Sequence, residues 1–577
     1  MKVVRLLCVL VGLIVSSFAL DREAFTFTKY DLSVRVEPEQ QRLGVRGKIT
    51  LRNDSNAPQK NIALQISSTL DWTSIQAGGS DVQFVTHEYT SDIDHTGALS
   101  EAIVTLSHEV APKGIVELEI GYEGVIPLDV TRLTRIGVPQ EKAKHTDWDQ
   151  IGKSFTAVRG IGYVVWYPVS SESADLSEGN TVFETIGRWR SREADSSVEI
   201  NLCFSASKSA PPVVMMNDPA HPASSVGQVA TAGDGTVCGQ HVYESVGLVG
   251  PLFLGADYSE LDEPSVELRY LREHKSGAEN YALAAALVAP TVSEWFGTPR
   301  QKAETVELPD PEASPFESGP MLLTPLTSTN STLYEMSAVH QLTHAAFFSP
   351  RLWIYEGLAH FAQALEQEQQ NGRQSALDFM GRQRSAIADA EKALLPARTQ
   401  NEAADESLIN TSVEEFYRSK AMYVWWMLRD MIGDAALKKS LAAYHADQDK
   451  ESAYLQRLIE AQTHRDLEWF FDDWVYRDRG LPDFHIVTAY ARTKVEGGSM
   501  VTVTIENLGD TGAEVPVTLR MEDGEVTKRI EVRGKSKAAV RIDASSTPLE
   551  VVVNDGSVPE RSTSNNIFKI PPPDDAK

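Results

Sequence analysis

The sequence predicts a multidomain α+β protein: an N-terminal β-sandwich or saddle-shaped β domain, a mainly helical middle domain and a C-terminal immunoglobulin-like β-sandwich. Apolar residues recur with a period of two up to about residue 258, with a helical period from about 259, and with a period of two again from about 481. The length of 577 residues also fits three or four domains of roughly 150 residues each.

The first 19 residues resemble an export signal. Lys2 and Arg5 give a basic start, residues 6–18 are apolar, and S-F-A at 17–19 is a small-residue cleavage site. The apolar run is shorter than the ~20 residues that span a bilayer. We therefore expect a cleaved signal peptide over 1–19, a periplasmic or secreted protein, and no membrane span in the mature chain.

The N-terminal β domain is expected over residues 20–258. Tyr30, Leu32, Val34 and Val36 alternate with polar residues, as in a strand with one buried face. After removal of the signal peptide, Cys203 and Cys238 are the only cysteines left. An oxidising compartment favours a disulfide between them, and two separate buried thiols are the alternative.

The middle domain is expected over 259–480. Residues 281–295 have helical spacing, 303–308 resemble a strand, and the Pro- and acid-rich stretch 309–320 resembles a loop. The chain is then helical in pattern from 328 almost to 479. Strict alternation resumes over 481–570, the predicted immunoglobulin-like sandwich. The Pro- and Asp-rich tail, 571–577, is expected to be disordered.

The charge balance limits the partners of the protein. The chain has 54 basic and 81 acidic residues, a formal net charge of −27. So acidic a surface repels the phosphates of nucleic acids, and no nucleic-acid partner is expected.

A candidate metal site lies in the middle domain. His340 and His344 are four residues apart within a predicted helix over 331–346, so both imidazoles project from one face. A break at 347–350 precedes a second helical pattern that carries Glu356. This layout returns a third ligand to the first helix, and two imidazoles with one carboxylate are a ligand set for zinc.

These residues and their flanks resemble the membrane-alanyl-aminopeptidase-like branch of the gluzincin metallopeptidases. The resemblance includes W-F-G-T-P at 295–299, K-A-M-Y-V-W-W-M-L at 420–428 and D-L-E-W-F-F-D-D-W at 466–474. It implies a thermolysin-like, mainly helical gluzincin domain between two β domains. It also implies peptide or protein substrates and one Zn²⁺ held by His340, His344 and Glu356.

This chain lacks the residue that serves as the general base in that family. The family has a glutamate directly after the first histidine, and this chain has Gln341, which gives H-Q-x-x-H. Glutamine cannot accept a proton from the attacking water, and loss of a general base lowers rates by about 10²–10⁴. On this reasoning, Gln341→Glu is expected to raise hydrolysis.

Two further family features also differ. Gly319 and the four residues after it read G-P-M-L-L, where the family has G-A-M-E-N and its glutamate binds the substrate's free amino terminus. The tyrosine that stabilises the oxyanion is replaced at its aligned position by Arg418, with Tyr417 one residue earlier. The oxyanion role passes to Arg418, to Tyr417 or to neither.

His360 lies one helical turn after Glu356, where it either supports a metal ligand from behind or is an ordinary surface histidine. Together these features predict an exported zinc-binding metallopeptidase-like protein of aminopeptidase ancestry with impaired hydrolysis. The alternatives are a catalytically dead pseudoenzyme that binds peptides or proteins at the cell envelope, and a structural envelope protein with a helical spacer. Bound zinc would separate the first two from the third.

Overall fold

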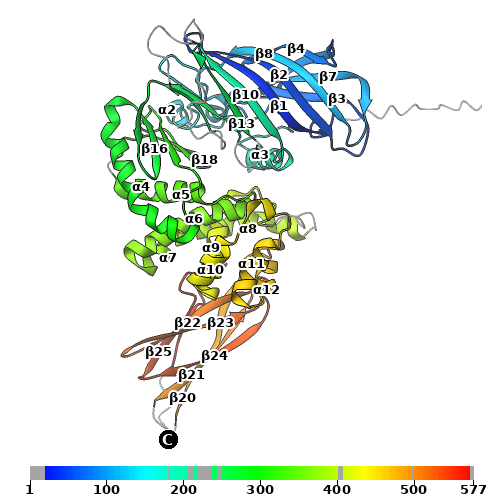
Figure 1. Ribbon diagram of the computed structural model, residues 1–577. Helices are drawn as coiled ribbons and strands as arrows, with labels where there is room; N and C mark the ends of the chain where they lie inside the picture. The colour runs from blue at the N-terminus through cyan, green and yellow to red at the C-terminus, as the bar shows by residue number, and fades with distance from the viewer. Residues whose placement is uncertain are drawn as a thin grey trace, which may run out of the picture.

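The structure, a computed structural model, describes residues 20–571 except 180, 206–212, 218–229, 232–235, 244, 245, 247–249, 329, 400–406 and 495–497. The signal peptide expected over 1–19 and residues 572–577 of the expected tail lie outside the described residues. The described chain is elongated, with the N-terminal sheets at one end, helices in the middle and a small sandwich at the other end (Figure 1). The predicted multidomain α+β class is confirmed at this coarse level.

The largest sheet of the described chain lies in the N-terminal region. In spatial order its strands are β12 (Ala230–Thr231), β13 (Val237–Tyr243), β10 (Ser197–Phe204), β1 (Phe25–Glu37), β2 (Arg42–Asn53), β8 (Ile115–Val125), β4 (Leu70–Ala77) and β5 (Ser80–Asp81). Tyr30, Leu32, Val34 and Val36 of β1 are buried, as the alternation predicts. A smaller sheet contributes to the same core; its strands are β3 (Gln59–Ser67), β7 (Ala98–Val110) and β6 (Gln83–Thr90).

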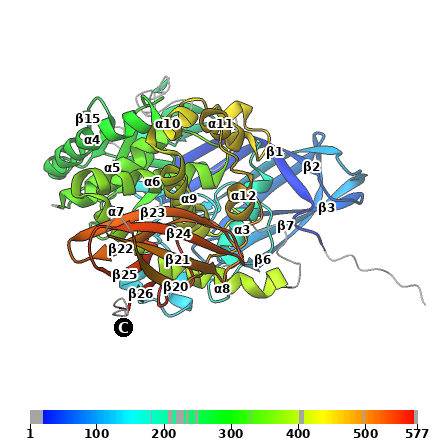
Figure 2. The same cartoon turned by 90° about the horizontal axis from the view of Figure 1, so that it is seen from below.

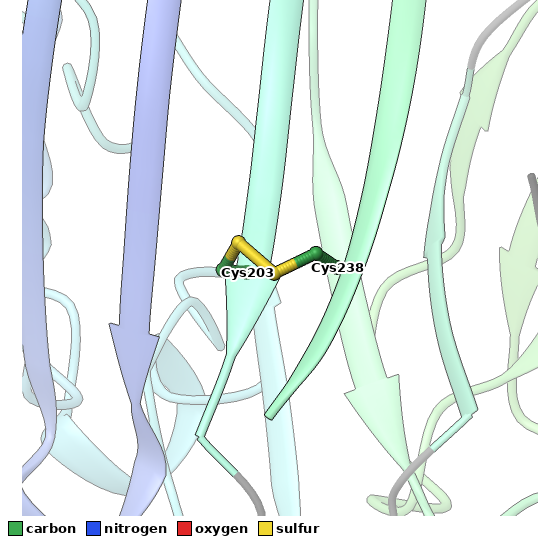
Figure 3. The surroundings of a disulfide bond; sticks show 2 residues. All are labelled: Cys203 and Cys238. Carbon is green, nitrogen blue, oxygen red and sulfur yellow. A yellow bond between two sulfur atoms is a disulfide. The ribbon is translucent and has the colours of Figure 1, made fainter. Parts of the chain in front are cut away.

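A disulfide bond joins two neighbouring strands of the large sheet. Strands β10 and β13 pair antiparallel, with Cys203 directly opposite Cys238. The two sulfur atoms are bonded, as Figure 3 shows. Of the two alternatives that the sequence leaves open, the structure therefore has the bridge.

Two sheets lie between the N-terminal region and the helices. One contains β11 (Val213–Met216), β14 (Phe253–Ala256) and β9 (Phe155–Val158). The other contains β15 (Ser259–Asp262), β16 (Val266–Tyr270), β17 (Ala303–Glu307), β19 (Met321–Thr324) and β18 (Phe316–Ser318). The two sheets share one apolar core, which includes Leu254, Val306 and Leu323. The expected loop over 309–320 thus contains a short edge strand, β18.

The middle of the molecule is helical. Helix α5 (Ser331–Ala346) has the bounds that the sequence predicts, and α4 (Lys275–Phe296) includes the helix expected over 281–295. The later helices are α6 (Leu352–Asn371), α7 (Arg373–Gly381), α8 (Arg384–Thr399), a π-helical turn (Glu415–Lys420), α9 (Ala421–Ile432), α10 (Asp434–Ala442), α11 (Tyr454–Thr463), α12 (Glu468–Phe471) and a second π-helical turn (Asp472–Tyr476). The N-terminal region adds the helices α1 (Thr131–Arg135), α2 (Gln140–Ala143) and α3 (Thr181–Arg192). Within the described residues, none of the helices combines the length and the apolar character needed to cross a bilayer.

The C-terminal sandwich has two facing sheets. One contains β20 (Phe484–Thr493), β21 (Ser499–Asn507) and β24 (Lys537–Ala544), and the other contains β23 (Gly524–Val532), β22 (Ala513–Met521), β25 (Pro548–Val553) and β26 (Ile567–Lys569). Seen from the sandwich end in Figure 2, the two sheets lie in front of the helical region. Gly512 joins the two regions: its oxygen accepts from Trp474 Nε1 at 2.7 Å and its N–H donates to Asp473 at 2.8 Å.

Candidate metal centre

A short turn between α5 and α6 sets the position of the site. Asn330 caps the start of α5 by accepting a hydrogen bond from the Leu333 N–H. After α5 ends, Ser349 Oγ accepts from the Arg351 N–H at 3.1 Å and lies 2.8 Å from Tyr444 Oη. These contacts fix the turn, so that α6 packs back against α5.

His340, His344 and Glu356 meet between these two helices. The Nε2 atoms of the two histidines are 3.1 Å apart. Glu356 Oε1 lies 3.7 Å from His344 Nε2, and Glu356 Oε2 lies 3.8 Å from His340 Nε2. Only 3% and 2% of the two histidine side chains and 14% of the glutamate side chain are exposed. The structure thus brings together the three residues that the sequence nominates as ligands.

Arg418 reaches the same carboxylate from the π-helical turn Glu415–Lys420. Its Nε donates to Glu356 Oε2 at 3.1 Å, and its Nη1 donates to Glu414. The Tyr417 ring lies beside Arg418, with its centroid 5.8 Å from the guanidinium carbon. Of the two candidates for the oxyanion role, Arg418 therefore contacts the metal-site glutamate directly.

Glu317 is a site residue that the sequence reasoning missed. It lies on β18, and its Oε2 is 3.1 Å from His340 Nε2. The sequence placed it in a loop, because the stretch 309–320 is rich in proline and acidic residues. The available signal was the triplet F-E-S at 316–318 directly before the Gly-Pro turn, a pattern typical of the first strand of a hairpin.

His360 adds a third imidazole. Its ring centroid is 4.9 Å from that of His340, with the planes at 80°. One ligand atom each from His340, Glu356 and His360 lies within 4.8 Å of the others. Burial lowers the pKa of His360 to about 3, and its Nε2 has no hydrogen-bond partner among the described residues. The imidazole is therefore neutral and available to contact a metal or its ligands.

Gln341 makes four hydrogen bonds with its side-chain amide. Its Nε2 donates to the main-chain oxygens of Glu304, at 2.6 Å, and Pro320, at 3.0 Å. Its Oε1 accepts from Tyr281 Oη at 2.7 Å and from Thr305 Oγ1 at 3.1 Å. The Gln341 amide is thus bonded to α4 and to the residues of the five-stranded sheet and its turn.

The segment aligned with the exopeptidase motif forms the turn and strand after β18. Leu322 and Leu323 on β19 are 2% and 0% exposed and belong to the apolar cores. A leucine in the core supplies no charge for a substrate amino group, so the structure provides no acidic anchor on β19.

The electrostatics favour a neutral imidazole at His344 and an ionised carboxylate at Glu356. Burial lowers the pKa of His344 to about 4, although the charge of Glu356 opposes it. Burial acts in the opposite direction on Glu356, but the charges of Arg418 and the two histidines outweigh it and lower that pKa to about 2. Burial also acts downward on His340, but Glu317 outweighs it and raises the pKa. Metals bind ionised carboxylates and neutral imidazoles, and a bound metal displaces a proton from such a histidine.

The donor set fits zinc. Zinc binds imidazole nitrogen and carboxylate oxygen at about 2.0–2.2 Å in a tetrahedral arrangement, which puts two ligand atoms about 3.3–3.4 Å apart. The two histidine nitrogens, 3.1 Å apart, lie close to that value, and each is within 3.8 Å of one oxygen of Glu356. Nitrogen and oxygen donors together also suit the borderline softness of zinc.

The comparisons with known proteins give evidence on the fold alone. No family model and no curated protein sequence matches the chain. Among solved structures, the chain is similar to an aminopeptidase A from Legionella pneumophila in complex with aspartic acid, with a TM-score of 0.58 and 10% sequence identity. The alignment covers 93% of this chain and 59% of that protein. It therefore shows an aminopeptidase-like fold, and the chain spans about 59% of the length of that protein.

A second solved structure is an M1 zinc metallopeptidase from Deinococcus radiodurans. It has 16% sequence identity and a TM-score of 0.43, with 76% of this chain and 90% of that protein covered. At this TM-score we draw no conclusion from it.

Proposed function

We propose that the chain is a zinc-binding protein of aminopeptidase ancestry that binds peptides and hydrolyses them slowly. The observation that carries the proposal is the convergence of two buried imidazoles and one ionised carboxylate, His340, His344 and Glu356, within a peptidase-like fold. A zinc ion bound there would supply Lewis acidity toward a peptide carbonyl.

Slow hydrolysis follows from the groups around this site. Gln341 has no carboxylate to accept a proton, and its amide is already bonded to the sheet. Arg418 and Tyr417 are the candidates for stabilising an oxyanion, but Arg418 already donates to Glu356 and Glu414. Without the general base, we expect rates about 10²–10⁴ below those of an intact peptidase. Without an acidic residue on β19, we expect no strong requirement for a free substrate amino terminus.

A second candidate function is a pseudoenzyme that binds peptides or proteins without turnover. The four hydrogen bonds of Gln341 favour it, because they make the residue part of the packing between α5 and the sheet. For both candidates we propose export through the signal peptide expected over 1–19 and no nucleic-acid partner.

The test measures zinc content and peptide turnover on the same preparations of mature protein. We expect one zinc per wild-type chain, none in His344→Ala, and an unchanged content in the control His108→Ala, which alters an exposed histidine on β7. Slow cleavage of some members of a peptide library supports the peptidase, and binding without cleavage supports the pseudoenzyme. A wild type free of metal after expression in zinc-replete medium would refute both.

A further inference from the structure

We propose that Glu317 is a fourth protein ligand of the metal, so that His340, His344, Glu356 and Glu317 enclose it. This proposal rests on the metal site of the proposed function and adds the coordination that distinguishes it from an open catalytic site. Catalytic zinc sites have three protein ligands and an open fourth position, whereas structural sites have four protein ligands.

The first argument is the distance from Glu317 to the cluster. Glu317 Oε2 lies 3.1 Å from His340 Nε2, and the two histidine nitrogens are also 3.1 Å apart. Glu356 is farther from these nitrogens, at 3.7 and 3.8 Å. The separation between Glu317 and His340 is near the ~3.3–3.4 Å edge of a tetrahedral zinc site. Glu317 is thus spaced from His340 as a ligand would be, no less than Glu356.

The second argument is the way β18 is held. Successive side chains of a strand point to opposite faces. On one side of Glu317, Phe316 packs edge-on against Tyr163 of the N-terminal region, with ring centroids 5.4 Å apart. On the other side, Ser318 Oγ accepts a hydrogen bond from Asn217 Nδ2 at 2.7 Å. The N-terminal region therefore holds both neighbours of Glu317, and the alternation turns Glu317 toward α5.

Asn217 is itself fixed. Its Oδ1 accepts from Tyr243 Oη at 2.8 Å and from the Leu252 N–H at 2.9 Å. Its Nδ2 also donates to the Gly250 oxygen at 2.9 Å. This network orders the segment that carries Glu317, so the carboxylate is presented to His340 by packed structure.

The third argument is charge. Two carboxylates and two neutral imidazoles balance a divalent cation, and Arg418 with Glu414 forms a neutral pair beside them. The four donors therefore complete a neutral site in a largely buried position, where an unbalanced charge is unfavourable. Four protein ligands would leave no open position for a catalytic water, so this inference favours the second candidate function, binding without turnover.

The test uses the full mature chain loaded with Zn²⁺ or Co²⁺, together with Glu317→Gln, Glu317→Ala and the control Glu335→Gln on α5. Loss of a group that only supports a ligand lowers metal affinity by about 10–100-fold. We expect Glu317→Gln to lower zinc affinity, measured by competition with a chelator, by at least about 100-fold. The control should leave it unchanged.

A second measurement asks whether the metal has an open coordination position. Azide should leave the visible spectrum of the wild-type Co²⁺ protein unchanged, because four protein ligands leave no position for it. Glu317→Ala opens a position, so its Co²⁺ spectrum should respond to azide. A wild-type spectrum that shifts with azide, or a Glu317→Gln affinity equal to that of the wild type, would overturn the fourth ligand while leaving the proposed function intact. A wild type that binds no metal would overturn the proposed function itself.

Discussion

Gln341 Nε2 donates a hydrogen bond to the main-chain oxygen of Glu304, 2.6 Å away. This bond joins α5 to the sheet strand β17. The Gln341 side chain is buried, and a buried donor or acceptor that loses its partner costs about 1–3 kcal/mol of stability. Gln341 therefore has a structural role in this chain.

The first prediction is that Gln341→Glu destabilises the protein. A glutamate at this position would place a carboxylate oxygen against the oxygens of Glu304 and Pro320, which cannot donate. Two buried acceptors would lose their donor, so we expect the free energy of unfolding to fall by about 2–4 kcal/mol.

Urea unfolding measures this change. The control is Gln140→Glu, the same substitution at an exposed position of α2, which should leave the stability within about 0.5 kcal/mol of the wild type. From the sequence alone, the expected outcome of the same substitution is a gain in hydrolysis. A Gln341→Glu variant that is as stable as the wild type and cleaves peptides about 100-fold faster would support that interpretation and contradict ours.

The second prediction concerns zinc removal. A ligand that binds only the folded state stabilises it by about 2.7 kcal/mol at a free concentration 100 times its Kd. We expect a chelator to lower the thermal midpoint of the wild type and zinc to restore it. His344→Ala should show no response to zinc, because it removes one of the two buried imidazoles.

His360→Ala supplies the comparison. His360 touches His340 through its ring, so its loss should weaken zinc binding by about 10–100-fold without abolishing the thermal response. If zinc raised the thermal midpoints of the wild type and of His344→Ala equally, His344 would not be a metal ligand.

The helix pair of the site could be predicted from the sequence because its signals are local. Four-residue spacing places His340 and His344 on one helical face, and the break at 347–350 returns Glu356 to them. Glu317 could not be found in this way. Its approach to His340 depends on a three-residue edge strand held by side chains of the N-terminal region, which are distant in sequence. The bonds of Gln341 likewise depend on where β17 and Pro320 lie in the tertiary structure.

The local backbone geometry sets which of Tyr417 and Arg418 reaches Glu356. The residues 415–420 form a π-helical turn, which contains one residue more than a turn of α-helix. The side chains that follow are rotated relative to an uninterrupted α-helix, and Arg418 is the residue whose guanidinium reaches Glu356. Helical spacing from sequence assumes 3.6 residues per turn and cannot anticipate this interruption.

The third prediction is a pH dependence of stability in the C-terminal sandwich. Burial raises the pKa of Glu560 from 4.5 to about 7, although Asn554 and Asn566 donate hydrogen bonds that oppose the shift. The folded state therefore binds a proton more tightly than the unfolded state. This contribution to stability is fully present below about pH 4 and is lost as the pH rises toward 7. At 1.36 kcal/mol per pKa unit, the loss is about 3 kcal/mol.

Glu560→Gln removes the titrating group. We expect the difference in unfolding free energy between pH 5 and pH 8 to be smaller by about 2–3 kcal/mol in this variant than in the wild type. The control Glu522→Gln, at an exposed position of the same sandwich, should keep the wild-type profile. Identical pH profiles for the wild type and Glu560→Gln would assign the dependence to another group.

The last prediction concerns the buried ammonium of Lys420, at the end of the π-helical turn. Its Nζ donates to the carboxylates of Glu391 on α8 and Asp478 and lies 3.4 Å from the Gly480 oxygen, and the side chain is fully buried. Removal of one partner from a buried ion pair leaves uncompensated charge and costs about 3–5 kcal/mol. We expect Lys420→Met to lower the unfolding free energy by this amount, because two carboxylates lose the same cation. Lys60→Met, at an exposed position of β3, controls for the substitution and should change stability by less than about 0.5 kcal/mol. Equal urea midpoints for the two variants would mean that Glu391 and Asp478 do not depend on Lys420.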